Sequence, residues 1–337
     1  MTGTRAFLLV LLLGTSVHAL DLASVQRAAA YSAQHQGKAV YVVQHDRVLL
    51  QSYANGGSAT EARKIYSGTK GFWILAALVA QEEGVLRLDD RVSETLPEWR
   101  ADPARSQLTI RDLLTFTAGL DPIFHLHADG IPNRNTIALA APVVAPRGER
   151  FIYGPAALQV CDEILRRKLA AHHDTPQHFL ERHVLAVLNL PPQIYKTDGA
   201  GNPLFAAGFR MTAEQWSRFG RVILHNGAPI VSPASFAQCC RGTAANPAFG
   251  MGLWNNHAAG YPGAREFDIE DVLELDWQKQ DWRDACICRS APPDLIAAVG
   301  SGYQRLFAVP SLDLVIVRLG DGGRFSDGEF LRLALGH

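Results

Sequence analysis

Apolar runs separated by short polar turns mark both ends of the chain. Residues 39–43 form a continuous apolar run, and residues 48–50 return after a polar turn. A second pair of runs, 305–309 and 314–318, flanks a proline-containing turn near the C-terminus. Runs of this length bounded by turn residues are typical of paired β-strands. The pattern therefore predicts one hairpin within residues 37–54 and another close to the C-terminal end.

The middle of the chain has a helical pattern. Apolar residues recur there at spacings of three and four, which places them on one face of a helix. Helices are predicted at residues 20–34, 71–83, 111–117, 156–172, 212–226 and 329–335. Strands at both ends predict an α+β fold in which both termini build one antiparallel sheet flanked by helices. A mostly helical second lobe, roughly residues 71–205, is expected to leave a cleft where it meets the sheet.

The first 19 residues have the pattern of an export signal. Arg5 precedes the apolar run 6–13, and Val17 and Ala19 are small residues at the two positions that a signal peptidase reads. The apolar run is far shorter than the roughly 20 residues of a membrane-spanning helix. We therefore expect cleavage after Ala19, a mature domain of residues 20–337 without a stable membrane anchor, and an exported protein, either periplasmic or secreted.

Composition and charge narrow the classes of partner. The chain has 337 residues, of which 47% are hydrophobic and 19% charged, and its formal net charge is −1. This is the composition of a globular domain, and it lacks the basic surplus of proteins that bind nucleic acid or anionic membranes. A small molecule is therefore the expected partner.

The five cysteines are grouped in an unusual way. Cys239 is adjacent to Cys240, and only one residue separates Cys286 from Cys288. Residues this close in the chain do not form relaxed disulfides with each other, and their spacing is shorter than that of usual zinc ligands. We therefore expect one or two disulfides between the two groups, with the connectivity left open. Cys161 is expected to be a buried thiol.

A serine and a lysine three residues apart carry the candidate chemistry. Ser67 and Lys70 precede the strongly apolar segment 71–79, which is predicted to be helical. Residues at i and i+3 share one face of a helix, so the lysine amine can reach the serine hydroxyl. A serine becomes a nucleophile when a nearby base removes its proton, and a lysine with a lowered pKa is such a base. The motif is short, and its chemical meaning depends on its context.

Several segments of the chain resemble the β-lactamase-related serine hydrolases, a superfamily that holds class C β-lactamases, D-alanyl-D-alanine carboxypeptidases, esterases and aminohydrolases. The similar segments, in the family's order, are residues 65–72, 84–90, 108–120, 207–213 and 218–220. The resemblance implies that Ser67 is the nucleophile and that Lys70 is its base. It also implies that no metal or organic cofactor is required.

The second motif of the family, Tyr-x-Asn, is matched only in part. Tyr153 follows the segment 146–148 and corresponds to the family's tyrosine, so the resemblance implies that it moves protons together with Lys70. Pro155 stands in the place of the asparagine. The side-chain amide that the family uses to hold its substrate is therefore missing.

The third motif of the family, Lys-Thr-Gly or His-x-Gly on a strand, is also altered. Ala298 stands where the family has a cation, and Gly300, Ser301 and Gly302 follow. The resemblance implies an oxyanion hole made by the backbone N–H groups of Ser67 and Ser301, with Gly300 and Gly302 next to the substrate. The segment 196–198, Lys-Thr-Asp, precedes the 207–213 match and is therefore not expected to supply this motif.

Two other functions compete with that of a serine hydrolase acting on an ester or small amide. His125, His127 and Asp129 have the spacing of a zinc site in an unrelated metallohydrolase fold, although Gly130 replaces the next histidine. A binding protein of the same fold that has lost catalysis is the other alternative, because two motifs are altered. The missing cation at Ala298 predicts that the protein is not an efficient β-lactamase.

Overall fold

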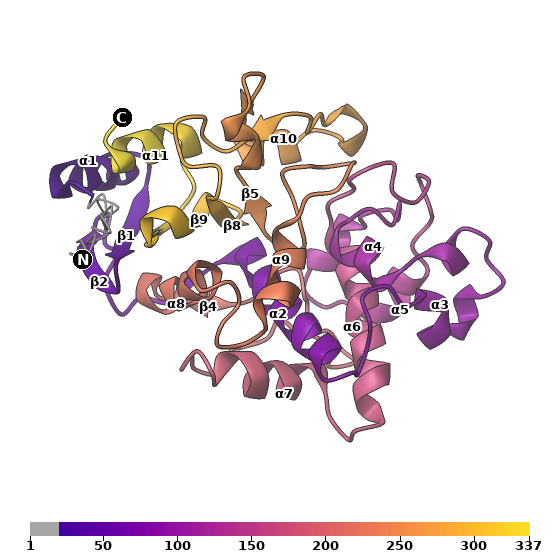
Figure 1. The fold of residues 1–337 in the computed structure, drawn as a ribbon. Coiled ribbons are helices and arrows are strands. Elements are labelled where there is room, and N and C mark those ends of the chain that lie inside the picture. Colours follow the sequence, from indigo (N-terminus) through magenta and orange to yellow (C-terminus); the bar gives the residue numbers. More distant parts are fainter. Residues whose placement is uncertain (1–19) are drawn as a thin grey trace, which may run out of the picture.

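The computed structural model describes residues 20–337, and the predicted export signal lies outside the described residues. Within residues 20–337, no helix has both the length and the apolar character needed to cross a membrane. The centre of the fold is a six-stranded antiparallel sheet with the strand order β2-β1-β10-β9-β8-β5 (Figure 1). Its strands are β1 (Gly37–Gln44), β2 (Arg47–Tyr53), β5 (Trp254–Asn255), β8 (Ile296–Gly300), β9 (Gln304–Val309) and β10 (Leu314–Gly320).

Both ends of the chain meet in this sheet, as predicted. β1 pairs with β10, with Val42 opposite Ile316. β9 and β10 are buried at every position, so helices must cover both faces of the sheet. Figure 1 shows α1 (Leu22–Gln34) and α11 (Asp327–Leu335) together on one side and α8 (Ala213–Leu224) on the other. The predicted α+β fold, with a sheet built from both termini, is confirmed.

The remaining helices lie in the part of the chain between β2 and β8. They are α2 (Thr69–Glu82), α3 (Val92–Thr95), α4 (Ile110–Leu114), α5 (Arg134–Leu139), α6 (Pro155–Ala170), α7 (Pro176–Leu180), α9 (Pro233–Cys240) and α10 (Ile269–Leu273). α2 is buried continuously from Thr69 to Ala80, because its apolar residues cover every face. The helix predicted at 111–117 stops at Leu114, since Phe116 has a left-handed backbone with a φ of 58°.

The hydrophobic pattern of the sequence does not predict two short pairs of strands. β3 (Arg63–Lys64) pairs in antiparallel with β4 (Arg210–Met211), directly before Ser67. β6 (Arg265–Glu266) pairs in parallel with β7 (Ala285–Cys286). Strands of two residues have no periodicity to detect, so only the tertiary structure reveals them.

The predicted disulfides are wrong, because all five cysteines have free thiols. The thiols of the two groups contact other partners. Cys239 Sγ donates a hydrogen bond to the Phe236 carbonyl oxygen, 2.9 Å away on its own helix. Cys288 Sγ lies 3.7 Å from the Gly328 carbonyl oxygen and 3.4 Å from Ser290 Oγ. Cys161 is buried, as expected.

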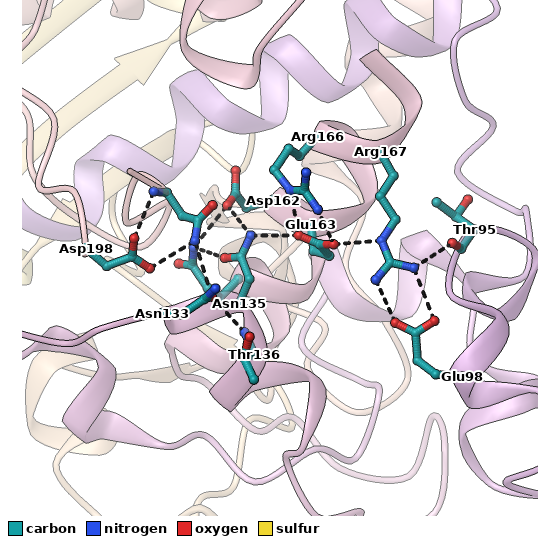
Figure 2. A network of polar contacts seen from close by, with 12 residues as sticks. Thr95, Glu98, Asn133, Asn135, Thr136, Asp162, Glu163, Arg166, Arg167 and Asp198 are labelled. Carbon is teal, nitrogen blue, oxygen red and sulfur yellow. Dashed lines mark hydrogen bonds and ion pairs between the residues drawn. The ribbon is translucent and has the colours of Figure 1, made fainter. Parts of the chain in front are cut away.

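A buried polar network joins α5 to α6 (Figure 2). Asn135 donates to Asp162 Oδ2 at 2.8 Å and to Glu163 Oε2 at 3.1 Å. The Glu163 carboxylate also accepts from Arg166 and Arg167, and Arg167 reaches on to Glu98. The other oxygen of Asp162, Oδ1, is buried without a hydrogen-bond partner among the described residues.

Candidate active site

Ser67 lies in a single turn of 3₁₀ helix, Tyr66–Gly68, that leads directly into α2. Tyr66 has a left-handed backbone with a φ of 45°, which turns the chain sharply as it leaves β3. The serine is partly exposed, whereas the residues that follow it are buried. This arrangement places the Ser67 hydroxyl at the surface of a cavity and the residues after it in the core.

Lys70 lies one turn further along and is 2% exposed. Its Nζ is 2.7 Å from Ser67 Oγ and 2.9 Å from the Ala206 carbonyl oxygen. Burial disfavours the ammonium form and lowers the pKa of Lys70 to about 7. A substantial fraction of Lys70 is therefore a neutral amine near neutral pH, which is the form that can accept the Ser67 proton.

Tyr153 is the third group at the nucleophile. Lys70 Nζ lies 4.7 Å from the centre of the Tyr153 ring. Burial and, to a smaller extent, the charge of Glu270 raise the pKa of Tyr153, while a side-chain hydrogen bond with Ser67 opposes this rise. The group is therefore a neutral phenol near neutral pH, and a phenol can donate a proton. The structure thus brings together the three side chains that the sequence predicted.

The turn after β8 lies beside Ser67. A Cβ atom at Gly300 would come within 2.0 Å of the Ile65 carbonyl oxygen, so this position requires a glycine for β8 to approach so closely. Ser301 follows and lines the same cavity as Ser67. The next two backbone N–H groups, those of Gly302 and Tyr303, donate to the Glu270 carboxylate at 2.7 and 2.9 Å. Glu270 therefore holds the turn on which the predicted second oxyanion donor lies.

The two glycines predicted to touch the substrate have other positions. Gly300 is buried against Ile65 and does not line the cavity at Ser67. Gly302 lines a neighbouring hollow of about 490 Å³, and its N–H group is already bonded to Glu270. Val299 and Ser301, rather than Ala298, face the cavity from this strand and its turn.

The cavity at Ser67 has a volume of about 970 Å³. Much of its lining is apolar or aromatic: Tyr66, Phe124, Tyr153, Ile194, Tyr195, Leu204, Ala207, Leu273 and Val299. Phe124 and Ile194 are 60% and 85% exposed, so the rim of the cavity is also apolar. Its charged residues are Lys64, Asp129, Lys196, Arg210, Glu270 and Glu274. A cavity of this size and lining suits a small organic substrate.

Two further residues of the cavity lie in segments for which the sequence predicts no role in a serine hydrolase. His127 lines the cavity, and burial together with the charges of Lys70 and Lys196 lowers its pKa to about 4, so its imidazole is neutral. Lys196 belongs to the segment 196–198, which was not expected to supply the third motif. It also lines the cavity, and it pairs with Asp129 at 3.0 Å. Within residues 20–337, no three His, Cys, Asp or Glu side chains are grouped as a metal site. His125, His127 and Asp129 therefore do not form such a group.

The chain matches the family model described as Beta-lactamase over residues 23–329. A curated relative, monacolin J acid methylbutanoyltransferase of Aspergillus terreus, is 29% identical over 163 residues. That match covers 40% of this chain and only 38% of the relative's length.

Solved structures share the whole fold at low sequence identity. The hydrolase EstCE1, described as having promiscuous acyltransferase activity, has a TM-score of 0.67 and 19% identity, covering 93% of this chain and 96% of its own. A D-stereospecific amidohydrolase from a Streptomyces species has a TM-score of 0.67 and 13% identity, covering 93% and 98%. The chain thus belongs to the Beta-lactamase family.

Proposed function

We propose that this protein hydrolyses a carboxylic ester or a small amide through an acyl-enzyme on Ser67. The observation that carries this proposal is the 2.7 Å contact between Ser67 Oγ and the buried Nζ of Lys70. Burial supplies a neutral amine at neutral pH, and the contact places it where the serine proton must go.

The proposed reaction has two steps. Ser67 Oγ attacks the substrate carbonyl carbon and gives its proton to Lys70, while the carbonyl oxygen becomes an oxyanion between the N–H groups of Ser67 and Ser301. Tyr153 donates a proton to the departing alcohol or amine and regains one from Lys70. The acyl-enzyme forms as that bond breaks. Water then attacks the acyl carbon and gives a proton to Lys70. The bond between the acyl carbon and Ser67 Oγ breaks as Lys70 passes this proton to Oγ, which releases the acid and restores Ser67.

The apolar lining of the cavity and the lack of a cation on β8 favour an ester or small amide over a β-lactam. The apolar walls can cover an alkyl or aromatic group. The strand beside Ser67 presents Val299 instead of a cation, so nothing on that strand holds a β-lactam carboxylate. The names of EstCE1 and the methylbutanoyltransferase both describe acyl transfer, which is the chemistry of an acyl-enzyme.

A substrate panel tests the proposal. Purified wild type and Ser67→Ala are assayed with 4-nitrophenyl esters of increasing acyl length, D-amino-acid amides and nitrocefin. We expect ester or amide hydrolysis that Ser67→Ala abolishes, with slow nitrocefin turnover. Equal rates in both proteins would refute the role of Ser67. Activity that needs stoichiometric zinc would favour the metallohydrolase alternative.

Export remains part of the proposal, supported by the pattern of residues 1–19. Expression of the full chain with its own leader, followed by N-terminal sequencing of the exported protein, should yield a first residue of Leu20. Retention of an uncleaved chain in the cytoplasm would contradict this.

A further inference from the structure

Two cations face each other directly on the β3–β4 pair. Lys64 of β3 is the register partner of Arg210 of β4, and both side chains are exposed. The other pair of this ladder, Arg63 and Met211, places the buried methionine opposite an arginine. Like charges directly opposite each other on neighbouring strands destabilise the pair. The repulsion between Lys64 and Arg210 therefore reduces the stability of the strand pair, and no contact within the described part of the fold explains why both residues are cations.

Neither of these two cations has an acidic partner. No ion pair or side-chain hydrogen bond joins Lys64 or Arg210 to any residue from 20 to 337, although Lys64 contributes a small share of the charge that lowers the pKa of Asp129. Other cations nearby are paired. Arg63 contacts Glu61 and Asp321, and Lys196 pairs with Asp129. Lys64 and Arg210 are thus the free positive charges at this site within the described part of the chain.

The pair lies beside the nucleophile. Both cations line the cavity at Ser67 and also the neighbouring hollow. Lys64 precedes Ser67 by three residues, so their Cα atoms are at most about 10 Å apart even along an extended chain. Long side chains at that distance can reach a group attached to the acyl chain of a substrate bound at Ser67.

The negative charges in the cavity lie on other elements. Asp129 pairs with Lys196, and Glu270 and Glu274 come from α10 and the residue that follows it. Glu270 is already bonded to Arg305 and to two backbone N–H groups, which leaves little of its charge for a ligand. Among the described residues, Lys64 and Arg210 are therefore the two adjacent side chains of the cavity whose charges are unpaired.

We propose that Lys64 and Arg210 form a carboxylate-binding subsite that selects substrates with an anionic acyl chain. This inference rests on the proposed acyl-enzyme at Ser67. A guanidinium and an ammonium side by side can share one carboxylate through charge-assisted hydrogen bonds. Binding of the carboxylate also relieves the repulsion between the two cations. The subsite lies on β3–β4, apart from β8, where the family's own cation would be.

Matched esters test this specificity. The probes are mono-4-nitrophenyl glutarate, which carries a carboxylate, its neutral methyl ester, and an ester of similar length that ends in trimethylammonium. Wild type is compared with the double variant Lys64→Gln/Arg210→Gln. Arg47→Gln is the control, because Arg47 is an exposed cation on β2, at the far edge of the sheet.

We expect wild type to prefer the anionic ester, and the double variant to lose about tenfold in kcat/KM for that ester alone, as for a charged hydrogen bond. The neutral ester should change little, and Arg47→Gln should behave as wild type. Salt should weaken the preference, since exposed charges are screened. An unchanged ratio in the double variant, or a preference for the cationic ester, would overturn the subsite.

A binding measurement separates this proposal from the catalytic one. Glutarate binding is measured by calorimetry on Ser67→Ala, with and without the two glutamine substitutions. A loss of about tenfold in affinity with the substitutions supports the subsite even if no ester is turned over. Equal glutarate binding in both proteins, or none in either, would contradict it.

Discussion

At the scale of single residues, burial sets the protonation state of the groups at Ser67. Among residues 20–337, no acidic side chain pairs with Lys70, and removal from water lowers its pKa. Tyr153 is shifted in the opposite direction by the same burial, because its charged form is the anion. One environment therefore produces a neutral amine that accepts a proton and a neutral phenol that donates one.

The pH dependence of hydrolysis follows from these shifts. Because Lys70 must be unprotonated and its pKa is about 7, kcat/KM for a neutral ester should rise between pH 6 and 8 and then level off. Tyr153 should add no falling limb below about pH 10, since its pKa is raised from the usual value near 10. Lys70→Met should lower the plateau by roughly 10²- to 10⁴-fold. A profile that is flat from pH 6 to 8 would contradict the role of Lys70.

Removal of the Tyr153 hydroxyl should affect substrates according to their leaving group. Tyr153→Phe keeps the ring that packs over Lys70 and removes the proton donor. For an alkyl ester or amide, we expect kcat to fall by roughly 10²- to 10⁴-fold. For a 4-nitrophenyl ester, whose leaving group needs no proton, the loss should be smaller. Equal losses for both substrates, measured side by side, would show that the hydroxyl does not donate this proton.

At the scale of elements, the site depends on how closely β8 approaches the turn that holds Ser67. Gly300 has no Cβ, and this allows the strand to lie against the Ile65 carbonyl. Glu270, from α10, then fixes the turn that carries Ser301 by accepting from the next two N–H groups. The two predicted oxyanion donors therefore come from elements more than 200 residues apart in the sequence.

A methyl group at Gly300 should separate these elements. Gly300→Ala should lower kcat by roughly 10²-fold or more, as the loss of an oxyanion donor does, because the new Cβ pushes β8 away from Ile65. Gly263→Ala is the matched control, since a Cβ there meets no atom within 4 Å. Activity and melting temperature are measured for both variants. A fully active Gly300→Ala protein would show that this close approach is not needed.

The network between α5 and α6 makes a prediction about stability. Burial and the neighbouring Glu163 raise the pKa of Asp162 from 3.8 to about 8, against the hydrogen bond from Asn135 (Figure 2). Between about pH 4 and pH 8 the folded state holds a proton that the unfolded chain has released. The free energy of unfolding should therefore fall as pH rises through this window.

Asp162→Asn removes this titration and keeps an acceptor for Asn135. At pH 8 the variant should be more stable than wild type by roughly 1 to 3 kcal/mol, the cost of an unsatisfied buried polar group. Urea unfolding at pH 5 and pH 8 measures the difference. If Asp162→Asn is destabilised equally at both pH values, the Asp162 carboxyl group stabilises the fold whatever its protonation state, which would contradict this prediction.

At the scale of the whole molecule, the predictable parts are those with long, regular patterns. The terminal strands, α2 and the Ser67–Lys70 spacing follow from apolar runs and helical periodicity. Tyr153 was found through resemblance, since a lone tyrosine has no pattern of its own. The same limits explain the error over the cysteines, because spacing in the chain says nothing about which thiols meet in space.

The charged lining of the cavity was beyond the reach of sequence reasoning. Lys64 and Arg210 meet only because two-residue strands pair across a separation of 146 positions. Lys196 reaches the cavity from a loop and His127 from the 3₁₀ helix Phe124–His127, and the positions of both depend on tertiary packing. The lack of a cation at Ala298 does not reveal that other cations line the cavity.

The most direct test of the central claim is covalent labelling of the nucleophile. Wild type and Ser67→Ala are treated with a fluorophosphonate at pH 8, and intact mass and peptide mapping locate the adduct. A serine activated by Lys70 should displace fluoride and carry one phosphonyl group on Ser67, and Ser67→Ala should stay unlabelled. An unlabelled wild-type protein, or an adduct that persists in Ser67→Ala, would contradict the claim that Ser67 is the nucleophile.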